Sequence, residues 1–99
     1  MIAYKFFFTK QAAETLKRLI ADVQEVSLLS AEKVRTRFFH KVHLIHHHPT
    51  QGSKKLELPG IDAHIRLAVV LHYKIYFTLE ENRIIVMEIL MDKDARANH

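Results

Sequence analysis

The chain has 99 residues, 48% of them apolar, and a formal net charge of +4, which is the length of one domain and too apolar for a disordered protein. It contains no cysteine, so disulfides and thiolate metal sites are excluded. No apolar run approaches the roughly 20 residues that a membrane helix needs. We therefore expect residues 1–99 to form a single cytoplasmic domain, with no membrane partner.

The N-terminal part of the chain has the pattern of a strand followed by a helix. Side chains from Ile2 to Phe8 alternate and are rich in aromatic rings, which predicts a strand. The hydroxyl of Thr9 can accept a hydrogen bond from a free amide, so Thr9 is the expected N-cap. Apolar residues then recur every three or four positions as far as Val26, which predicts an amphipathic helix.

A second helix is expected after a break at residues 27–30, with Ser30 as its N-cap. Its apolar stripe runs from Ala31 to Ile45. A basic face lies opposite the stripe, and we expect it to be solvated rather than to bind nucleic acid. It consists of Lys33, Arg35, Arg37 and Lys41. Pro49 cannot continue the helix, and Gly52 provides freedom for a turn. Because the break is short, the segment from Thr9 to His48 is expected to form an antiparallel helical hairpin.

The C-terminal part reads as sheet, with strands expected at residues 64–71, 73–79 and 84–91. The last two are joined by a tight connection in which Asn82 can take a left-handed conformation. The stretch from Ile84 to Met87 is apolar on both faces, which predicts a central strand. The order β-α-α-β-β-β predicts an α+β fold with an antiparallel sheet packed against the N-terminal helical hairpin.

The same periodicities predict which side chains form the core. They lie on one stripe of each helix and on the strands after residue 64. The expected core residues are Leu16, Leu19, Ile20, Val23, Val34, Phe38, Val42, Tyr73, Ile75, Phe77, Ile85 and Met87.

A histidine run at the end of the second helix raises the question of a metal site. His43 and His47, or His40 and His43, have the spacing of neighbours on one helical face. Structural zinc sites take four ligands, and neither a cysteine nor a well-placed carboxylate joins these histidines. Histidine also suits the negative end of the helix dipole. We therefore expect neither a metal nor another cofactor.

Several motifs, taken in order, resemble the RelE/ParE toxin superfamily. The family often ends its second helix with an apolar residue, three variable residues, a proline, two variable residues and a glycine. The stretch from Ile45 to Gly52 has this pattern. Arg66 opens a strand, and Tyr73 follows seven residues later at the start of the core strand Tyr-Lys-Ile-Tyr-Phe. A last aliphatic strand and a basic tail with Lys93 and Arg96 complete the pattern, so the likeness covers nearly the whole chain.

This resemblance implies the toxin of a type II toxin–antitoxin, or plasmid stabilisation, module. It also implies a cognate antitoxin whose acidic, amphipathic C-terminal segment folds onto the toxin. A basic surface fits such a partner. An alternative function, of a different class, is that of a non-toxic binding module that shares the fold.

Within the superfamily, two activities compete. The long hairpin resembles the ParE branch, which inhibits DNA gyrase and has no known chemistry of its own. The RelE branch cuts messenger RNA in the ribosome, and metal-independent cleavage needs a base, an acid and cations for the phosphorane. If the protein is such an endoribonuclease, the expected catalytic residues are His72, Lys74, Arg66 and Arg96. Acidic residues in the tail, Asp92 and Asp94, disfavour the approach of RNA, so gyrase inhibition is the first expectation.

For contacts with the target or the antitoxin we expect Arg66, Lys74, Lys93 and Arg96. Arg66 can bind a phosphate or an antitoxin carboxylate in a bidentate manner, or it can form a structural ion pair with Glu57, Asp62 or Glu88. We also expect that Lys74 and Tyr76 do not line one site together.

Overall fold

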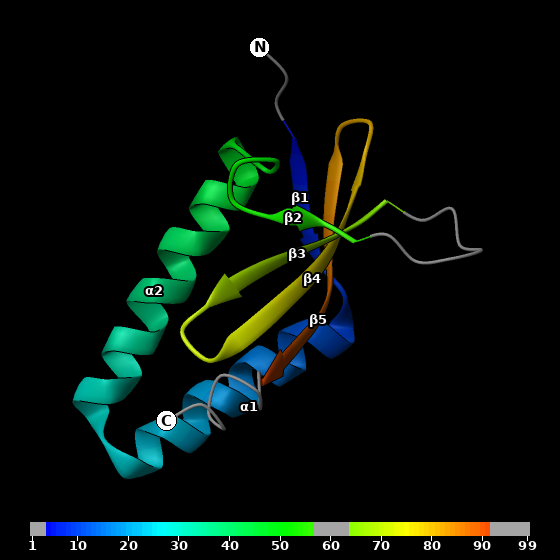
Figure 1. Ribbon diagram of the computed structural model, residues 1–99. Coiled ribbons are helices and arrows are strands. Elements are labelled where there is room, and N and C mark those ends of the chain that lie inside the picture. The colour runs from blue at the N-terminus through cyan, green and yellow to red at the C-terminus, as the bar shows by residue number, and fades with distance from the viewer. Residues whose placement is uncertain (1–3, 57–63, 92–99) are drawn as a thin grey trace.

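The computed structural model describes residues 4–56 and 64–91 of the chain. It shows two helices and a five-stranded sheet, so the predicted α+β class is confirmed (Figure 1). In chain order, the elements are β1 (Lys5–Phe8), α1 (Lys10–Val26), α2 (Leu28–His47), β2 (Lys54–Lys55), β3 (Ile65–Val70), β4 (Tyr73–Glu80) and β5 (Arg83–Met91).

The strands lie in the order β1-β5-β4-β3-β2, and the sheet is mixed. Three of its four pairings are antiparallel, as expected, but β1 pairs with β5 in parallel. Parallel pairing becomes possible because the whole helical hairpin and three strands separate β1 from β5, which is far more than the dozen residues that a crossover requires. The additional strand β2 has only two residues, too few to show a period in the sequence.

The two helices share a single joining residue, Ser27. It ends α1, where its amide donates to the carbonyl of Val23 over 2.9 Å, and it caps α2, where its hydroxyl accepts from the amide of Ser30 over 3.2 Å. The expected N-cap at Ser30 is therefore wrong by three residues. Thr9 caps α1 as predicted, accepting from the amide of Ala12 over 3.1 Å.

The helices cover one face of the sheet, with α1 on β1 and β5 and α2 on β3. Between these layers lies a core whose largest fully buried side chains are Phe77, Ile45, Ile75, Ile84 and Val86. Most of the predicted core residues are buried or packed against this core.

Two predicted core residues on β5 are not in the core. Ile84 and Val86 are buried instead of Ile85, which points to the opposite face of the sheet. Met87 is the extra residue of a β-bulge, since Tyr76 pairs with Glu88 while Phe77 pairs with Val86. The run from Ile84 to Met87 is apolar at every position, so this run does not show which side of the strand faces inward.

Two hairpin turns place non-glycine residues in the left-handed region, Leu71 with φ 54° and Glu81 with φ 39°. The left-handed residue of the β4–β5 turn is therefore Glu81 rather than the expected Asn82. Neither helix of the described chain carries a stretch long and apolar enough to span a membrane.

Candidate partner-binding surface

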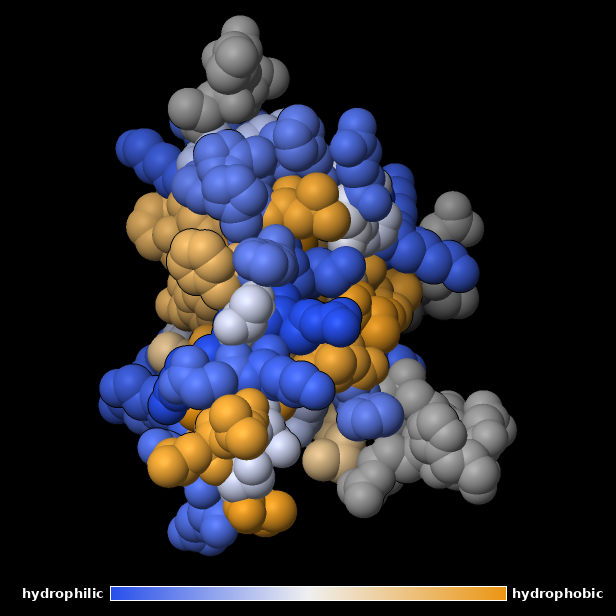
Figure 2. Space-filling model, turned by 90° about the vertical axis from the view of Figure 1, so that its left-hand side faces the viewer, coloured by the Kyte–Doolittle hydropathy of each residue, from blue (hydrophilic) through white to orange (hydrophobic). Residues whose placement is uncertain are grey.

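Helix α2 carries a basic ridge on its outer side. The exposed side chains of Lys33, Arg37 and His40 lie on it, next to the half-buried Lys41. Figure 2 looks onto this side and shows hydrophilic side chains along the middle, with hydrophobic ones gathered on both sides and again at the lower end. At that lower end, where the helices join, Val26, Leu28 and Leu29 are 86%, 67% and 81% exposed.

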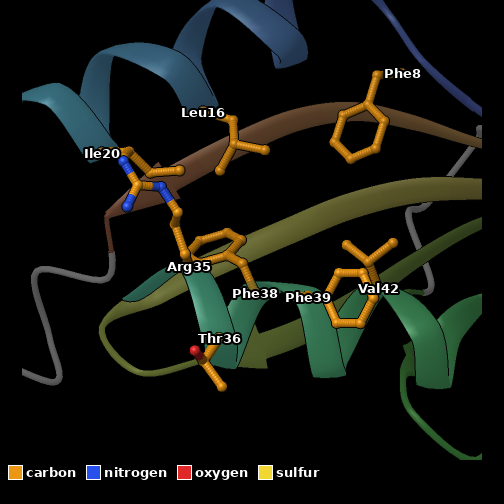
Figure 3. Close-up of a pocket in the computed structure, with 8 residues that line it drawn as sticks. All are labelled: Phe8, Leu16, Ile20, Arg35, Thr36, Phe38, Phe39 and Val42. Carbon is orange, nitrogen blue, oxygen red and sulfur yellow. The ribbon is translucent and has the colours of Figure 1, made fainter. Parts of the chain in front are cut away.

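On one side of the ridge lies a groove between α1 and α2, which we call the interhelical groove. It has a volume of about 520 Å³ and opens because the helices diverge from Ser27 (Figure 1). Figure 3 shows the rings of Phe8, Phe38 and Phe39 around it, with Leu16 and Ile20 projecting from α1. The other lining residues are Arg35, Thr36 and Val42. Phe39 is 71% exposed, which is unusual for a ring at the mouth of an apolar groove and is typical of a contact surface.

On the other side of the ridge lies a second groove, between α2 and β3, which we call the α2–β3 groove. Its volume is about 390 Å³. The helix side contributes Arg37, His40, Lys41 and Leu44, and the strand side contributes Val69, Val70 and Leu71. One wall is therefore cationic and the other aliphatic, which suits a partner segment that is both acidic and apolar.

Arg37 and Lys41 belong to the basic face that the sequence predicts on the second helix. The sequence pattern did not show that a strand edge lies beside them, so this groove was missed.

Arg66 is half-buried and bonded to the segment that follows α2. Its Nε donates to the hydroxyl of Ser53 over 2.6 Å, and its guanidinium also donates to the carbonyls of Ser53 and Thr50 over 3.2 and 3.4 Å. The side chain therefore fastens β3 to the segment that follows α2. Of the three ion-pair partners considered, Glu57 and Asp62 lie outside the described residues, and Glu88 accepts instead from Gln11.

The remaining predicted site residues are spread over the fold. Lys74 lies on the sheet face opposite the helices, whereas His72 lies in the β3–β4 turn, beside a hollow between α1 and the sheet. Lys93 and Arg96 lie outside the described residues. The structure thus does not bring Arg66, His72 and Lys74 together.

Lys74 and Tyr76 share one face of β4, so the expectation that they do not line one site is wrong. They are two residues apart, and side chains two apart on a strand point the same way. Between them, Ile75 is buried on the helix side. Across the strands, Lys74 pairs with Val69 and Tyr76 with Leu67.

The histidines near the end of α2 form a ring cluster. His43 and His47 have ring centroids 4.4 Å apart, while a ring nitrogen of His46 lies 2.7 Å from the carbonyl oxygen of Tyr4. Loss of water around the ring, together with the like charges of His43, His46 and His48, lowers the pKa of His47 from its ordinary value of 6.5. Among residues 4–56 and 64–91, no group of three or more histidine, cysteine or carboxylate side chains is placed to hold a metal ion.

The fold is shared with chains of two solved structures. A chain in the solved structure of the chromosomal ParDE TA system from P. aeruginosa superposes with a TM-score of 0.69 and 18% identity, covering 90% of this chain and 96% of that chain. A chain of the archaeal RelE–RelB complex from Pyrococcus horikoshii OT3 gives a TM-score of 0.61 and 16% identity, covering 92% and 97%. No curated protein sequence matches this one.

The family model described as "ParE toxin of type II toxin-antitoxin system, parDE" matches residues 6–95. The chain therefore belongs to the ParE toxin family. The resemblance seen in the sequence is confirmed, with a match that begins at Phe6 and ends at Ala95.

Proposed function

We propose that this ParE-family toxin inhibits DNA gyrase by binding it, without chemistry of its own, and that a cognate antitoxin neutralises it. Our choice of gyrase rather than RNA as the target rests on one observation. The described side chains that metal-free RNA cleavage would need point in different directions, while the helical hairpin exposes an apolar groove suited to a protein partner.

The separation of these side chains follows from strand geometry. Arg66 lies four residue steps from the end of β3 at Val70, roughly 13 Å of strand, and His72 lies beyond that end, in the turn. Arg66 also faces the helix side, where it is bonded to Ser53, whereas Lys74 faces the other side of the sheet. A general acid and a general base have to lie within hydrogen-bond reach of the same substrate. These three groups do not meet that condition.

The proposal of an antitoxin partner rests on charge and on the solved relatives. Both structural neighbours are described as toxin–antitoxin systems or complexes. The net charge of +4 and the basic ridge of α2 favour an acidic partner. An acidic antitoxin segment would cover apolar surface such as Phe39, which a lone soluble chain exposes at a cost in solubility.

A RelE-like endoribonuclease is the second candidate, and two observations favour it. Lys74 and Tyr76 stand side by side on the sheet face that α1 and α2 leave open, and the fold also matches the toxin of the RelE–RelB complex. On this alternative, a cation and a phenol would approach RNA together.

Two assays on the purified toxin separate these candidates. We expect it to reduce supercoiling by purified gyrase and to leave messenger RNA intact on translating ribosomes. Unimpaired supercoiling together with cleavage in the ribosomal A site would reverse the assignment. Growth arrest on induction, relieved by the product of a neighbouring antitoxin gene, tests the toxin role itself, and continued growth would favour a non-toxic binding module.

A further inference from the structure

The last turns of α2 carry two histidines on the outer side of the helix. Residues four apart in a helix lie on the same face, and the side chains of His43 and His47 are both exposed. Ile45, which lies between them in sequence, is buried in the core. The histidine pair therefore faces away from the rest of the fold.

The two imidazole rings stand close together. Their centroids are 4.4 Å apart. Two imidazoles bound to one tetrahedral zinc ion, with Zn–N distances of about 2.0–2.1 Å, have centroids roughly 5 Å apart. Rotation of the exposed rings about their side-chain bonds covers this small difference. The arrangement of His43 and His47 is thus close to that of two ligands of one ion.

Neither ring of the pair is engaged within residues 4–56 and 64–91. His43 and His47 form no hydrogen bond or ion pair there, whereas Nε2 of the neighbouring His46 lies 2.7 Å from the carbonyl oxygen of Tyr4. A tetrahedral zinc ion takes four ligands, and within the same residues no third side chain joins the pair to form a metal-holding group. The described part of one chain therefore supplies half of a zinc site.

A second copy of the chain carries the other half. The same two histidines, related by a two-fold axis through the ion, would complete the four ligands, as in an isologous interface. Phe39 lies one turn before His43 on α2, and its ring is 71% exposed. A second α2 helix held at the ion would lie against this ring and cover apolar surface that is otherwise in water.

Charge opposes this contact when no ion is present. Each chain has a net charge of +4, and the basic ridge lies on the same helix as the histidine pair. Two such surfaces repel each other. Association of the two copies should therefore depend on the metal.

We propose that His43 and His47 form half of a zinc site, and that zinc joins two copies of the chain through the outer faces of their α2 helices. Each imidazole binds through a nitrogen lone pair, and zinc undergoes no redox change. The sequence predicts no metal because one chain offers too few ligands, and the second copy doubles their number. The inference goes beyond the proposed function and does not depend on it, since it concerns two copies of this chain alone.

Sedimentation of the whole purified chain with zinc chloride tests the proposal. We expect a monomer in EDTA or in magnesium, and a doubling of mass at one zinc ion per two chains, which EDTA reverses. Cobalt in place of zinc should give the intense visible absorption of a tetrahedral site rather than the weak absorption of a six-coordinate one. A chain that stays monomeric in zinc, or that binds one ion per chain without doubling its mass, would overturn the proposal.

Three alanine variants test the choice of ligands. His43→Ala and His47→Ala each remove half of the ligands from the two-chain site, so each should abolish the dimer at a zinc concentration that saturates the wild type. His40→Ala, another exposed histidine of α2, is the matched control and should dimerise as the wild type does. All three should keep the wild-type circular dichroism in EDTA, because the side chains are exposed. A zinc dimer that survives His47→Ala, or that is lost in His40→Ala, would contradict the assignment.

Discussion

The Nε of Arg66 donates to the hydroxyl oxygen of Ser53 over 2.6 Å, and that hydroxyl in turn donates to the carbonyl of Pro49. The first of these bonds spans 13 residues of sequence, and together they tie β3 to Pro49, just after the end of α2. The sequence predicts that Arg66 contacts the target or the antitoxin. In the structure, its guanidinium holds the segment after α2 against β3.

Removing this link should lower stability. Since hydrogen bonds to a charged group contribute about 1.5–3 kcal/mol, we expect Arg66→Ala to reduce the free energy of unfolding by about 2 kcal/mol, and Ser53→Ala by about 1 kcal/mol. Denaturant unfolding measures both. The double variant should lose less than the sum, because both changes break one interaction. Strict additivity, or an unchanged midpoint for Arg66→Ala, would show that the link is dispensable.

Leu71 adopts φ 54° in the β3–β4 turn, where a side chain with a Cβ is strained. A left-handed conformation costs an L-residue roughly 1–2 kcal/mol, and glycine avoids this cost. We expect Leu71→Gly to raise the free energy of unfolding by about 1 kcal/mol over Leu71→Ala, which keeps the Cβ. Thermal unfolding of the two variants tests this, and a less stable glycine variant would contradict it.

Gly52 packs closely against α2. A Cβ placed there would lie 3.0 Å from Cγ of Leu44, so the leucine would have to move. We expect Gly52→Ala to destabilise the chain by about 1–3 kcal/mol, the usual cost of overpacking. Shortening the neighbour should relieve the clash. In the background of Leu44→Ala, the cost of Gly52→Ala should therefore fall to near zero, and an unchanged cost would place the strain elsewhere.

The pKa of His47 is lowered in the folded chain, which sets the sign of a pH dependence. The unfolded chain then binds the proton more readily, so stability present above pH 6.5 is lost as the pH falls below that value. We expect the melting temperature to drop between pH 7.5 and pH 5.5, and to drop less in His47→Gln. NMR titration of His47 checks the cause, and a pKa at or above 6.5 would contradict it.

Phe39 is expected to contribute to gyrase inhibition through the interhelical groove. Because its ring is largely exposed, Phe39→Ser should change stability by no more than about 0.5 kcal/mol. Inhibition of supercoiling should weaken about tenfold, since an exposed aromatic ring is a typical interface anchor. Leu29→Ser, at the equally exposed lower end of the hairpin, is the matched control. Equal inhibition by wild type and Phe39→Ser would exclude the groove as the contact surface.

Periodicity predicted the elements well where only one face is apolar. The stripe of α2 placed Val34 and Phe38 in the core, and the hydroxyl of Thr9 marked the start of α1. Prediction failed where the pattern carries no phase or too little length. Ile85 lies in a run of four apolar residues within β5, and β2 is two residues long.

The site was less predictable than the fold, because it depends on which elements become neighbours. The alternation of β3 does not show that β2 ends beside Leu67, nor that α2 then lies along the strand at Val69. Arg66 is an example of a predicted contact residue that the structure uses differently. Its residue type suggests binding, but the position of Ser53 decides its role, and no spacing in the sequence encodes that position.

The sheet is completed by β5, the last of the described strands in chain order. β5 lies between β1 and β4, so residues 83–91 have to be synthesised before the first strand can find its neighbour. Pairings between segments so distant in sequence also form slowly. A chain that stops before β5 therefore leaves β1 without the strand that it pairs with, and it removes a strand against which α1 packs.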